Sequence, residues 1–453
     1  MTVNEATITN SQGRSNFDYR MKDDYLEAWE DAYNTKVVAV SLLGKKRGTL
    51  AGKRSLTSIM SRYSQSMGLA LFEDSTLPTP HVGAGFKPEI MTRYVFGRLR
   101  WTWAVEAMAR AGGKGVWKAP RAEDLRTGRL QFELNGARMM YLGPTQCMST
   151  ITVATSDTDF TVGGRNQRTE GANFRFMFAH HYLRIGSPLA NVNDNAGAVA
   201  PLGGTYSSTM RRVDAIDDSN PEAVTVSMDG ALSAVGVNDL LIPHGSRRNT
   251  DATDDAAMDS DLAGPNGLLN LVVDSTYKDF VYSISRVIEP SLEGTILANS
   301  GVLRAFDENW IELADDEITN DERSSGDDPN IVLCHQSMRR NYVNQVKGLR
   351  MFGETITKRG YGPNLQHTAG DTPLTIKTDR DCPPSLLFVL DTNSFGWYSE
   401  SEFQWVDEGE RFVADQAQHE IVVVRSGNEV CRRPRSNAMV GDFIYSVSGL
   451  VPA

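Results

Sequence analysis

The chain has 453 residues, of which 40% are hydrophobic and 23% charged, and its formal net charge is −11 at pH 7. This length exceeds the usual size of one domain, so we expect two domains, or one domain with large excursions. The acidic balance argues against nucleic-acid binding by the fold as a whole, because such binding needs a basic face.

The four cysteines lie too far apart for the CxxC spacing of zinc and redox sites. A disulfide framework is unexpected at this length, and a reducing interior is the simpler setting. The polar N-terminus has no apolar signal core, and no apolar run approaches the roughly 20 residues that cross a bilayer. The sequence therefore predicts a soluble protein that is made and used without export.

The N-terminal segment divides into a polar and an aromatic part. Residues 1–16 are rich in Thr, Asn, Ser and Gln, and we expect them to be disordered. Between residues 17 and 33 aromatic side chains recur among acidic ones: Tyr25 and Trp29 are four residues apart, and Leu26, Trp29 and Tyr33 share one helical stripe. Two interpretations stay open, a helix that packs on its own core or an arm that packs on an adjacent subunit.

A basic, glycine-rich segment follows the apolar residues 36–43. Its spacing falls one residue short of the phosphate-binding motif GxxxxGK[ST], and Arg54 stands where that motif needs Ser or Thr. A solvated or interface-pairing loop is therefore expected. Its five basic residues are candidates for contacts between subunits: Lys45, Lys46, Arg47, Lys53 and Arg54.

One strand and two helices are expected next. Residues 91–99 have the pattern of a strand, and a first helix is expected from Trp101 to Gly112. A second helix is expected from Ala122 to Leu142, although Gly128 inside it costs about 1 kcal/mol relative to Ala. Its apolar stripe, which we expect to provide the packing of this helix, consists of Leu130, Leu134, Ala137 and Tyr141.

The remaining two thirds of the chain are expected to be rich in strands. Helices are expected only at 303–322 and 337–349, and a turn at 265–267. Short strands are expected at 151–153, 160–162, 183–186, 211–216, 223–228, 239–242, 331–334, 374–377, 386–391, 403–406, 420–425 and 442–447.

No pattern of catalytic or metal-binding residues emerges. The motifs HExxH and GxSxG are absent, and adjacent residues such as His180 and His181 in a strand point to opposite faces. Cys334 and His335 are also adjacent, a poor geometry for a thiol–imidazole couple. Acidic residues between Asp251 and Asp261 lack the central glycine and terminal Glu of a calcium loop. We therefore predict no catalytic, cofactor-binding or metal-binding residue.

Several segments, taken in order, resemble the major capsid proteins of tailed bacteriophages, which share the Hong Kong 97-like fold. The likeness covers roughly residues 20–447 and depends on order and pattern rather than on one diagnostic motif. The segments that carry it are 70–78, 94–102, 121–143, 211–217, 238–241, 265–269 with 285–286, and 328–335.

The resemblance implies an α+β fold with five parts. These are an N-terminal arm, an extended β-hairpin loop, a peripheral domain with a long spine helix, a β-rich axial domain with a strand-rich insertion near 186–245, and C-terminal strands that return to the peripheral domain. Their expected bounds are 1–36, 37–98, 99–150, 151–375 and 376–453. No long charged helical prodomain precedes Phe17, which departs from some relatives.

The resemblance also implies a function. The chain would be a structural protein, not an enzyme, that assembles in the host cytoplasm into the icosahedral head shell of a virion around double-stranded DNA. Its partners would be copies of itself in pentamers and hexamers, a portal, non-specifically contacted DNA and, in some relatives, a decoration or cement protein, with no membrane involved. The alternatives are an encapsulin-like compartment shell, a tail or portal component, and an enzyme with an unrecognised β-rich site.

Overall fold

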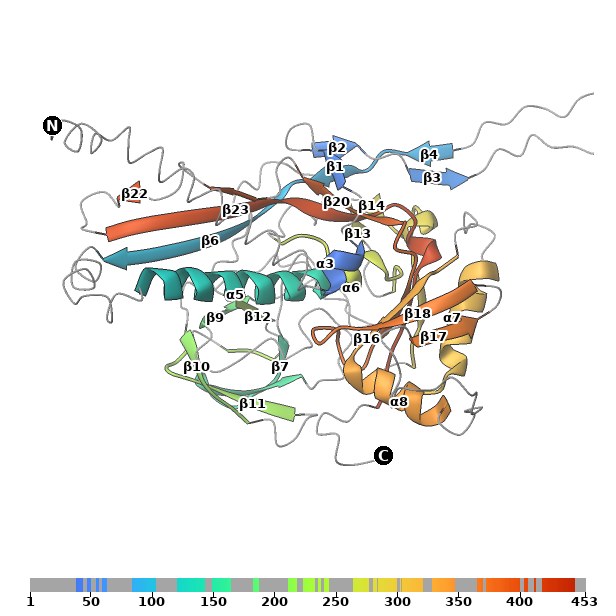
Figure 1. Cartoon of the computed structure of the whole chain (residues 1–453). Coiled ribbons are helices and arrows are strands. Elements are labelled where there is room, and N and C mark those ends of the chain that lie inside the picture. Colours follow the sequence, from blue (N-terminus) through green and yellow to red (C-terminus); the bar gives the residue numbers. More distant parts are fainter. Residues whose placement is uncertain are drawn as a thin grey trace, which may run out of the picture.

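The structure of the protein is a computed structural model, and it mixes helices and strands as the expected α+β class requires (Figure 1). The described residues are 38–43, 47–49, 54–56, 59–62, 84–102, 120–142, 149–163, 182–186, 211–217, 223–232, 235–237, 240–243, 264–276, 280–282, 284–299, 302, 304–320, 328–346, 365–369, 372–399, 403–405, 411–412 and 418–444.

A long two-stranded ribbon and a long helix form one side of the molecule. Strand β6 (Arg93–Thr102) pairs antiparallel with β23 (Gln418–Cys431), and helix α5 (Pro120–Tyr141) runs along this ribbon (Figure 1). The helix confirms the second of the two expected helices. The first was placed wrongly at its start, because Trp101 and Thr102 continue β6 by pairing with His419 and Gln418. Its remainder lies outside the described residues.

Further strands widen the ribbon along β23. Strands β20 (Phe395–Ser399), β21 (Phe403–Trp405) and β22 (Arg411–Phe412) pair antiparallel with β23, and β1 (Arg47–Thr49) pairs parallel with β20. Residues from three distant parts of the sequence therefore share one sheet.

Glycines let helix and ribbon approach closely. A Cβ atom at Gly97 of β6 would lie 1.9 Å from Cε2 of Phe132, and one at Gly128 of α5 would lie 2.9 Å from Leu99. Each element thus presents a glycine to a large side chain of the other. This contact supplies the tertiary support that a helix with an internal glycine needs.

A closed six-stranded barrel lies below α5 in Figure 1. Its strands follow the order β10-β11-β8-β7-β12-β9, and all its pairings are antiparallel. The barrel begins before the insertion expected near 186–245, and the sequence predicted all six strands within two residues. They are β7 (Ser149–Ala154), β8 (Asp159–Gly163), β9 (Tyr182–Gly186), β10 (Arg211–Asp217), β11 (Ala223–Met228) and β12 (Leu240–Pro243).

A second six-stranded sheet carries two helices on one face. Its order is β15-β24-β19-β16-β18-β17. Alternate residues of its inner strands point to opposite faces: Val332 and Val389 pack against the helices, whereas Leu333 and Phe388 face the main core. The elements are β15 (Thr295–Leu297), α7 (Asn309–Asn320), β16 (Ile331–Cys334), α8 (Gln336–Val346), β17 (Leu365–Ala369), β18 (Thr372–Thr378), β19 (Leu387–Leu390) and β24 (Ala438–Val440).

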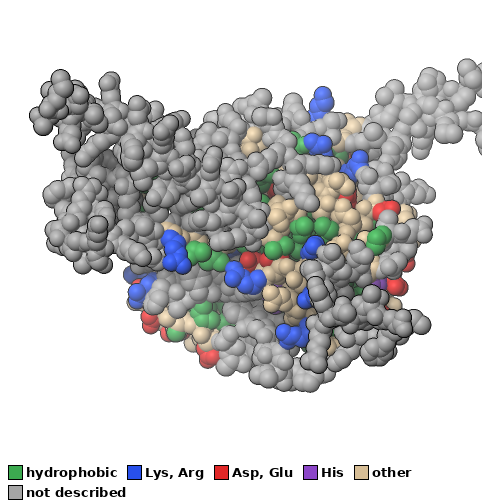
Figure 2. Space-filling model, in the orientation of Figure 1, with side chains coloured by type: hydrophobic (Ala, Val, Ile, Leu, Met, Phe, Trp, Pro, Cys, Tyr) green, Lys and Arg blue, Asp and Glu red, His purple; other side chains and the backbone are tan. Residues whose placement is uncertain are grey.

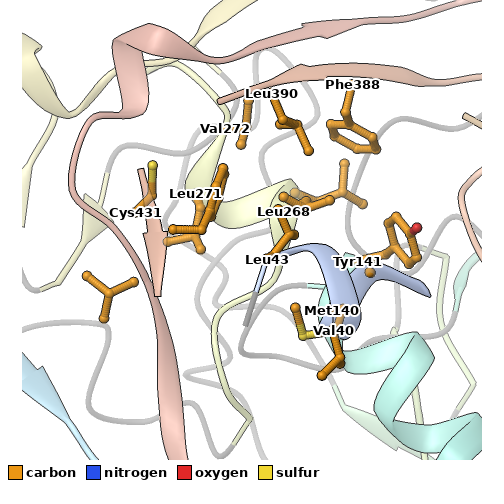
Figure 3. Packing of buried hydrophobic residues seen from close by; sticks show 14 of the residues in the cluster. Val40, Leu43, Met140, Tyr141, Leu268, Leu271, Val272, Phe388, Leu390 and Cys431 are labelled. Carbon is orange, nitrogen blue, oxygen red and sulfur yellow. The ribbon is translucent and has the colours of Figure 1, made fainter. Parts of the chain in front are cut away.

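The main core joins these parts (Figure 3). Helix α3 (Val38–Leu43) and the C-terminal end of α5 meet over the short helix α6 (Leu268–Leu271), so that Val40, Leu43, Met140 and Tyr141 share one buried cluster with Phe388. Around it lie β13 (Phe280–Val281), β14 (Ile284–Ser285) and the short 3₁₀ helices η2 (Pro290–Leu292) and η5 (Pro434–Ser436).

Two local predictions were wrong. The last strand, expected at 442–447, lies at 438–440, and within 442–444 only Phe443 forms a bridge, to Arg304. The helix expected from 303 begins only at Asn309, and Arg304 before it forms the bridge to Phe443. The segment expected as a turn, 265–267, is buried and hydrogen-bonded: Asn266 accepts from Asn270, and its backbone N–H donates to Asn428. The order of projecting hairpin, long strand, spine helix and β-rich remainder nevertheless agrees with the Hong Kong 97-like arrangement.

Candidate assembly surfaces

A narrow hairpin extends from the body at the upper right of Figure 1. Strand β2 (Arg54–Leu56) pairs antiparallel with β5 (Glu89–Met91), and β3 (Ile59–Arg62) pairs with β4 (Ala84–Phe86). Each ladder has two strands in the described part of the chain, so both outer edges lack a neighbour there. Two-stranded ribbons are marginally stable in water and their open edges favour pairing with other chains.

The base of this hairpin is fixed to the body. Ile59 and Ile90 are fully buried in the main core, and Phe86 packs against it. The chain approaches the hairpin through β1, which is paired with β20, and it leaves through β6. A rigid base below a ribbon of marginal stability is suited to holding a neighbouring molecule. Sequence reasoning did not single out Ile59 and Ile90.

Two of the five predicted basic contacts can be placed. Arg47 lies in β1, where its backbone faces Trp397, and Arg54 lies in β2, where it faces Met91. The others, Lys45, Lys46 and Lys53, lie outside the described residues, as do Tyr25, Trp29 and Tyr33 of the N-terminal segment. Their contacts between subunits therefore stay predictions.

The predicted stripe of α5 is only half buried within the chain. Ala137 and Tyr141 lie in the main core, but Leu130 and Leu134 are 43% and 44% exposed. The packing role predicted for these two leucines therefore stays a prediction. Phe132, on the opposite side of the helix, makes the contact with the ribbon instead. The glycines at 97 and 128 were the available signal, because an internal glycine often marks a close approach.

The outer face of the ribbon carries exposed aromatic side chains. Because neighbouring residues of a strand point to opposite faces, Tyr94, Phe96 and Arg98 lie opposite Gly97 and its helix contact. Tyr94 and Phe96 are 47% and 64% exposed, and their rings stack at 6.3 Å between centroids. Arg98 donates to the buried Glu420 across the strands. Exposed aromatic pairs on a rigid ribbon are typical of contact surfaces between proteins.

The end of α5 is tied to the second sheet by a buried hydrogen bond. The Tyr141 hydroxyl donates to Asp379 Oδ2 at 2.7 Å, and Asp379 Oδ1 accepts from the backbone of Asp381. Burial is the main reason that the pKa of Tyr141 lies well above its usual value. This bond fixes the spine helix relative to β18, which ends at Thr378.

Two described cysteines and two described histidines lie in hydrogen-bonded surroundings. Cys334 and Cys431 are buried, and burial raises the pKa of each thiol from 9.0 to about 12, so neither is a thiolate nucleophile at neutral pH. His335 Nδ1 lies 2.8 Å from the Ser337 hydroxyl, within the start of α8. His367 is buried, and its Nδ1 lies 3.0 Å from the Tyr342 hydroxyl.

The described residues do not gather into a metal site or, on the face shown in Figure 2, into a basic patch. Among the described residues no three His, Cys, Asp or Glu side chains gather closely enough to hold a metal ion. On the face in Figure 2, the coloured Lys and Arg side chains are scattered rather than joined in one basic patch. Within the residues that the structure describes, no helix is both long and apolar enough to span a membrane.

No family model matches the chain, and none of the curated proteins matches it. Several solved structures, however, are similar to the chain. The capsid asymmetric unit of cyanophage A-1(L) is similar at a TM-score of 0.48 and 9% identity, over 90% of this chain and 93% of that one. The capsid of Myoviridae phage XM1 is similar at 0.41 and 7%, over 88% of both.

The likeness is to phage capsid proteins. The holo-SrpI encapsulin complex from Synechococcus elongatus is similar as well, at a TM-score of 0.38 and 6% identity, over 90% of this chain and 89% of that one. At these identities and TM-scores, the function has to be derived from the geometry of the chain itself.

Proposed function

We propose that this chain is the major capsid protein of a tailed bacteriophage, which self-assembles in the host cytoplasm into the icosahedral head shell around double-stranded DNA. It acts as a structural protein and not as an enzyme. Its principal partners are copies of itself arranged in pentamers and hexamers. The portal, any decoration protein and the packaged DNA are further partners, and DNA is contacted without sequence specificity.

The hairpin formed by β2 to β5 is the observation that carries this proposal. It has a buried base, and among the described residues its edges have no partner strand, so this part of the chain fixes the position of the hairpin without completing its pairing. A closed shell needs heterologous contacts that repeat around rotation axes. A protruding ribbon meets that need, because it adds contact area on a neighbour without enlarging the core of its own subunit.

Basic residues at the start of the hairpin would pair with acidic groups across the seam between subunits. Contacts of this kind fix register and partner choice more than affinity. Replacing Lys45 and Lys46 by Glu should therefore reduce the yield of particles, whereas replacing both by Arg should retain it. Particle yields are measured by sedimentation at matched protein concentration. Equal yields from the two variants would show that these lysines do not contribute to the interface.

The decisive experiment shortens the hairpin without removing its base. Arg62 and Ala84 face each other across the β3–β4 ladder, so residues 63–83 can be replaced by a two-residue Asn-Gly turn. We expect a folded chain, with an unchanged circular dichroism spectrum, that stops at monomers or capsomers in negative-stain images. Normal icosahedral shells from this variant would contradict the proposal.

The contents and shape of particles formed by the unaltered chain distinguish the alternative functions. Nuclease-protected DNA inside native particles supports a phage head, whereas protected protein cargo without DNA indicates an encapsulin-like compartment. Rings or tubes in place of closed shells indicate a portal or tail component. A chain that stays monomeric under every assembly condition has none of these roles.

A further inference from the structure

Strand β23 buries two glutamates in different surroundings. Glu420 is 2% exposed, and its carboxylate accepts a hydrogen bond from Arg98 of β6. Glu429 is 1% exposed, and neither of its carboxylate oxygens has a hydrogen-bond partner among the described residues. An ionised carboxylate without a partner is costly in a protein interior, whereas a neutral carboxyl group costs much less. The surroundings of Glu429 therefore favour its protonated form.

The groups close to Glu429 do not neutralise a negative charge on it. Trp397 lies directly opposite on β20, and the Cζ atom of Arg425 lies 3.6 Å from the centre of the Trp397 ring, so the guanidinium stacks on the indole. Tyr282 and Cys431 also interact with Glu429, but neither carries a positive charge. Burial raises the pKa of Glu429 from 4.5 to about 8, although Arg425 acts in the opposite direction.

Two further arginines belong to neighbouring elements. Arg286, which interacts with Tyr282, donates to the carbonyl oxygens of Leu292 and Asn270. Its hydrogen bonds therefore hold it without the help of Glu429. Arg47 of β1 is registered with Trp397 across the sheet.

The sheet around Glu429 can open locally, because β23 changes partners at Gly427. Strand β6 pairs with β23 as far as Gly427, and β20 pairs with it from Asn428 onward. The segment after the glycine is also held by the body, since the Tyr282 hydroxyl accepts from the backbone N–H of Cys431 at 2.8 Å. Strand β20 is therefore the element that can move away from Glu429 while β23 stays in place.

Movement of β20 would reach the hairpin. Strand β1 pairs with β20 in parallel, and the chain passes from β1 to β2, the first strand of the hairpin (Figure 1). A weaker contact between β20 and β23 would thus loosen one of the two strands by which the hairpin joins the body.

We propose that Glu429 is a proton-dependent latch: its neutral carboxyl group allows β20 to close on β23, and loss of the proton favours separation of β20 together with β1. The latch belongs to the single chain, so this inference does not depend on the proposed shell. The stability contributed by the group is complete below pH 4.5 and is lost as the pH rises to about 8, where the folded group also ionises. Within this window each pH unit favours the open state about tenfold.

Hydrogen exchange of the full-length, unassembled chain at pH 6 and pH 8 tests the latch. After correction for intrinsic exchange, amides of β1 and β20 should open at least tenfold more at pH 8. Glu429→Gln has nearly the same shape and is neutral at both pH values, so its corrected rates should be equal. The matched control is Glu317→Gln on the exposed side of α7, which should keep the wild-type profile.

The remaining outcomes overturn the proposal. A flat profile in the wild-type chain would mean that Glu429 is already ionised at pH 6 and paired, with Arg425 or Arg47. A profile that persists in Glu429→Gln would assign the pH dependence to another group. Equal acceleration in β8 of the barrel would indicate unfolding of the whole chain instead of a local opening. Loss of the near-ultraviolet circular dichroism of Glu429→Gln at pH 6 would show that the fold needs the carboxylate.

Discussion

At the scale of single residues, Asp315 is a buried acid on α7. It is 6% exposed, and its Oδ1 has no hydrogen-bond partner among the described residues. Burial, and then the nearby carboxylates of Asp328 and Asp316, raise its pKa from 3.8 to about 6. The folded chain therefore binds the proton more tightly than the unfolded chain. The stability contributed by this group is complete below pH 4 and is lost as the pH rises through about 6.

Asp315→Asn should accordingly stabilise the chain at pH 8, where the wild-type carboxylate is charged. The gain is at most about 3 kcal/mol, from roughly two pKa units at 1.4 kcal/mol each. At pH 4 the two chains should differ little. Urea denaturation of unassembled protein at both pH values measures the difference, with Glu317→Gln on the exposed side of α7 as the control. A gain of equal size at pH 4 and pH 8 would show that charge is not its cause.

Gly427 is a second residue whose identity the structure requires. Its φ is +139°, and a Cβ atom there would lie 2.5 Å from Nε1 of the buried Trp397. Gly427→Ala should lower the free energy of unfolding by about 2–4 kcal/mol, combining backbone strain with overlap against a packed ring. Gly230→Ala meets only the Arg211 side chain at 3.1 Å and should cost far less. Equal losses in chemical denaturation would contradict this account.

At the scale of elements, the contact between α5 and β6 depends on a matched glycine and aromatic ring. Gly97→Ala should destabilise the chain by more than 2 kcal/mol, because its methyl group would overlap Phe132. Phe132→Ala should cost about 3–5 kcal/mol through the cavity that it leaves. The double variant should cost at least 1 kcal/mol less than the sum, since the new methyl then occupies vacated space. Strict additivity in urea denaturation would mean that the two residues do not meet.

Local pattern predicted most elements, and its failures have identifiable causes. The barrel strands and α5 follow from alternation, helical spacing and turn residues that act over a few positions. Trp101 was assigned to a helix because its spacing to Val105 and Met108 is helical, but pairing with His419, more than 300 residues away, keeps it in β6. The stripe of α5 revealed which positions are apolar, not that Leu130 lies beyond the reach of the described core.

The candidate contact surfaces were less predictable than the elements. The hairpin could be expected from the resemblance and from its basic, glycine-rich start. Its anchors Ile59 and Ile90 are ordinary apolar residues in short strands, and nothing local distinguishes them from other isoleucines. The exposed pair Tyr94 and Phe96 is also invisible to periodicity, because an alternating strand with apolar residues on both faces does not indicate which face has water beside it.

At the scale of the whole molecule, burial is divided among three separate cores. The barrel has its own, which includes Ile151, Phe160 and Val226, and shares no residue with the others. A second core lies between the six-stranded sheet and helices α7 and α8. The main core joins α3, the end of α5, α6 and the inner face of that sheet. A destabilising substitution should therefore mainly affect the elements that surround the core in which the substituted residue lies.

Hydrogen exchange can test this division with two matched substitutions of buried phenylalanine. Phe160→Ala should accelerate amide exchange across β7 to β12 and leave β16 and β19 unchanged, because the closed barrel packs around its own interior. Phe388→Ala should act on both sides of the main core, since its ring lies 6.3 Å from that of Tyr141 while its backbone pairs with β16. Faster exchange in β16 and β19 after Phe160→Ala would mean that barrel and body unfold as one unit. In that case the barrel would be part of the cooperative core rather than a module attached beside the spine helix.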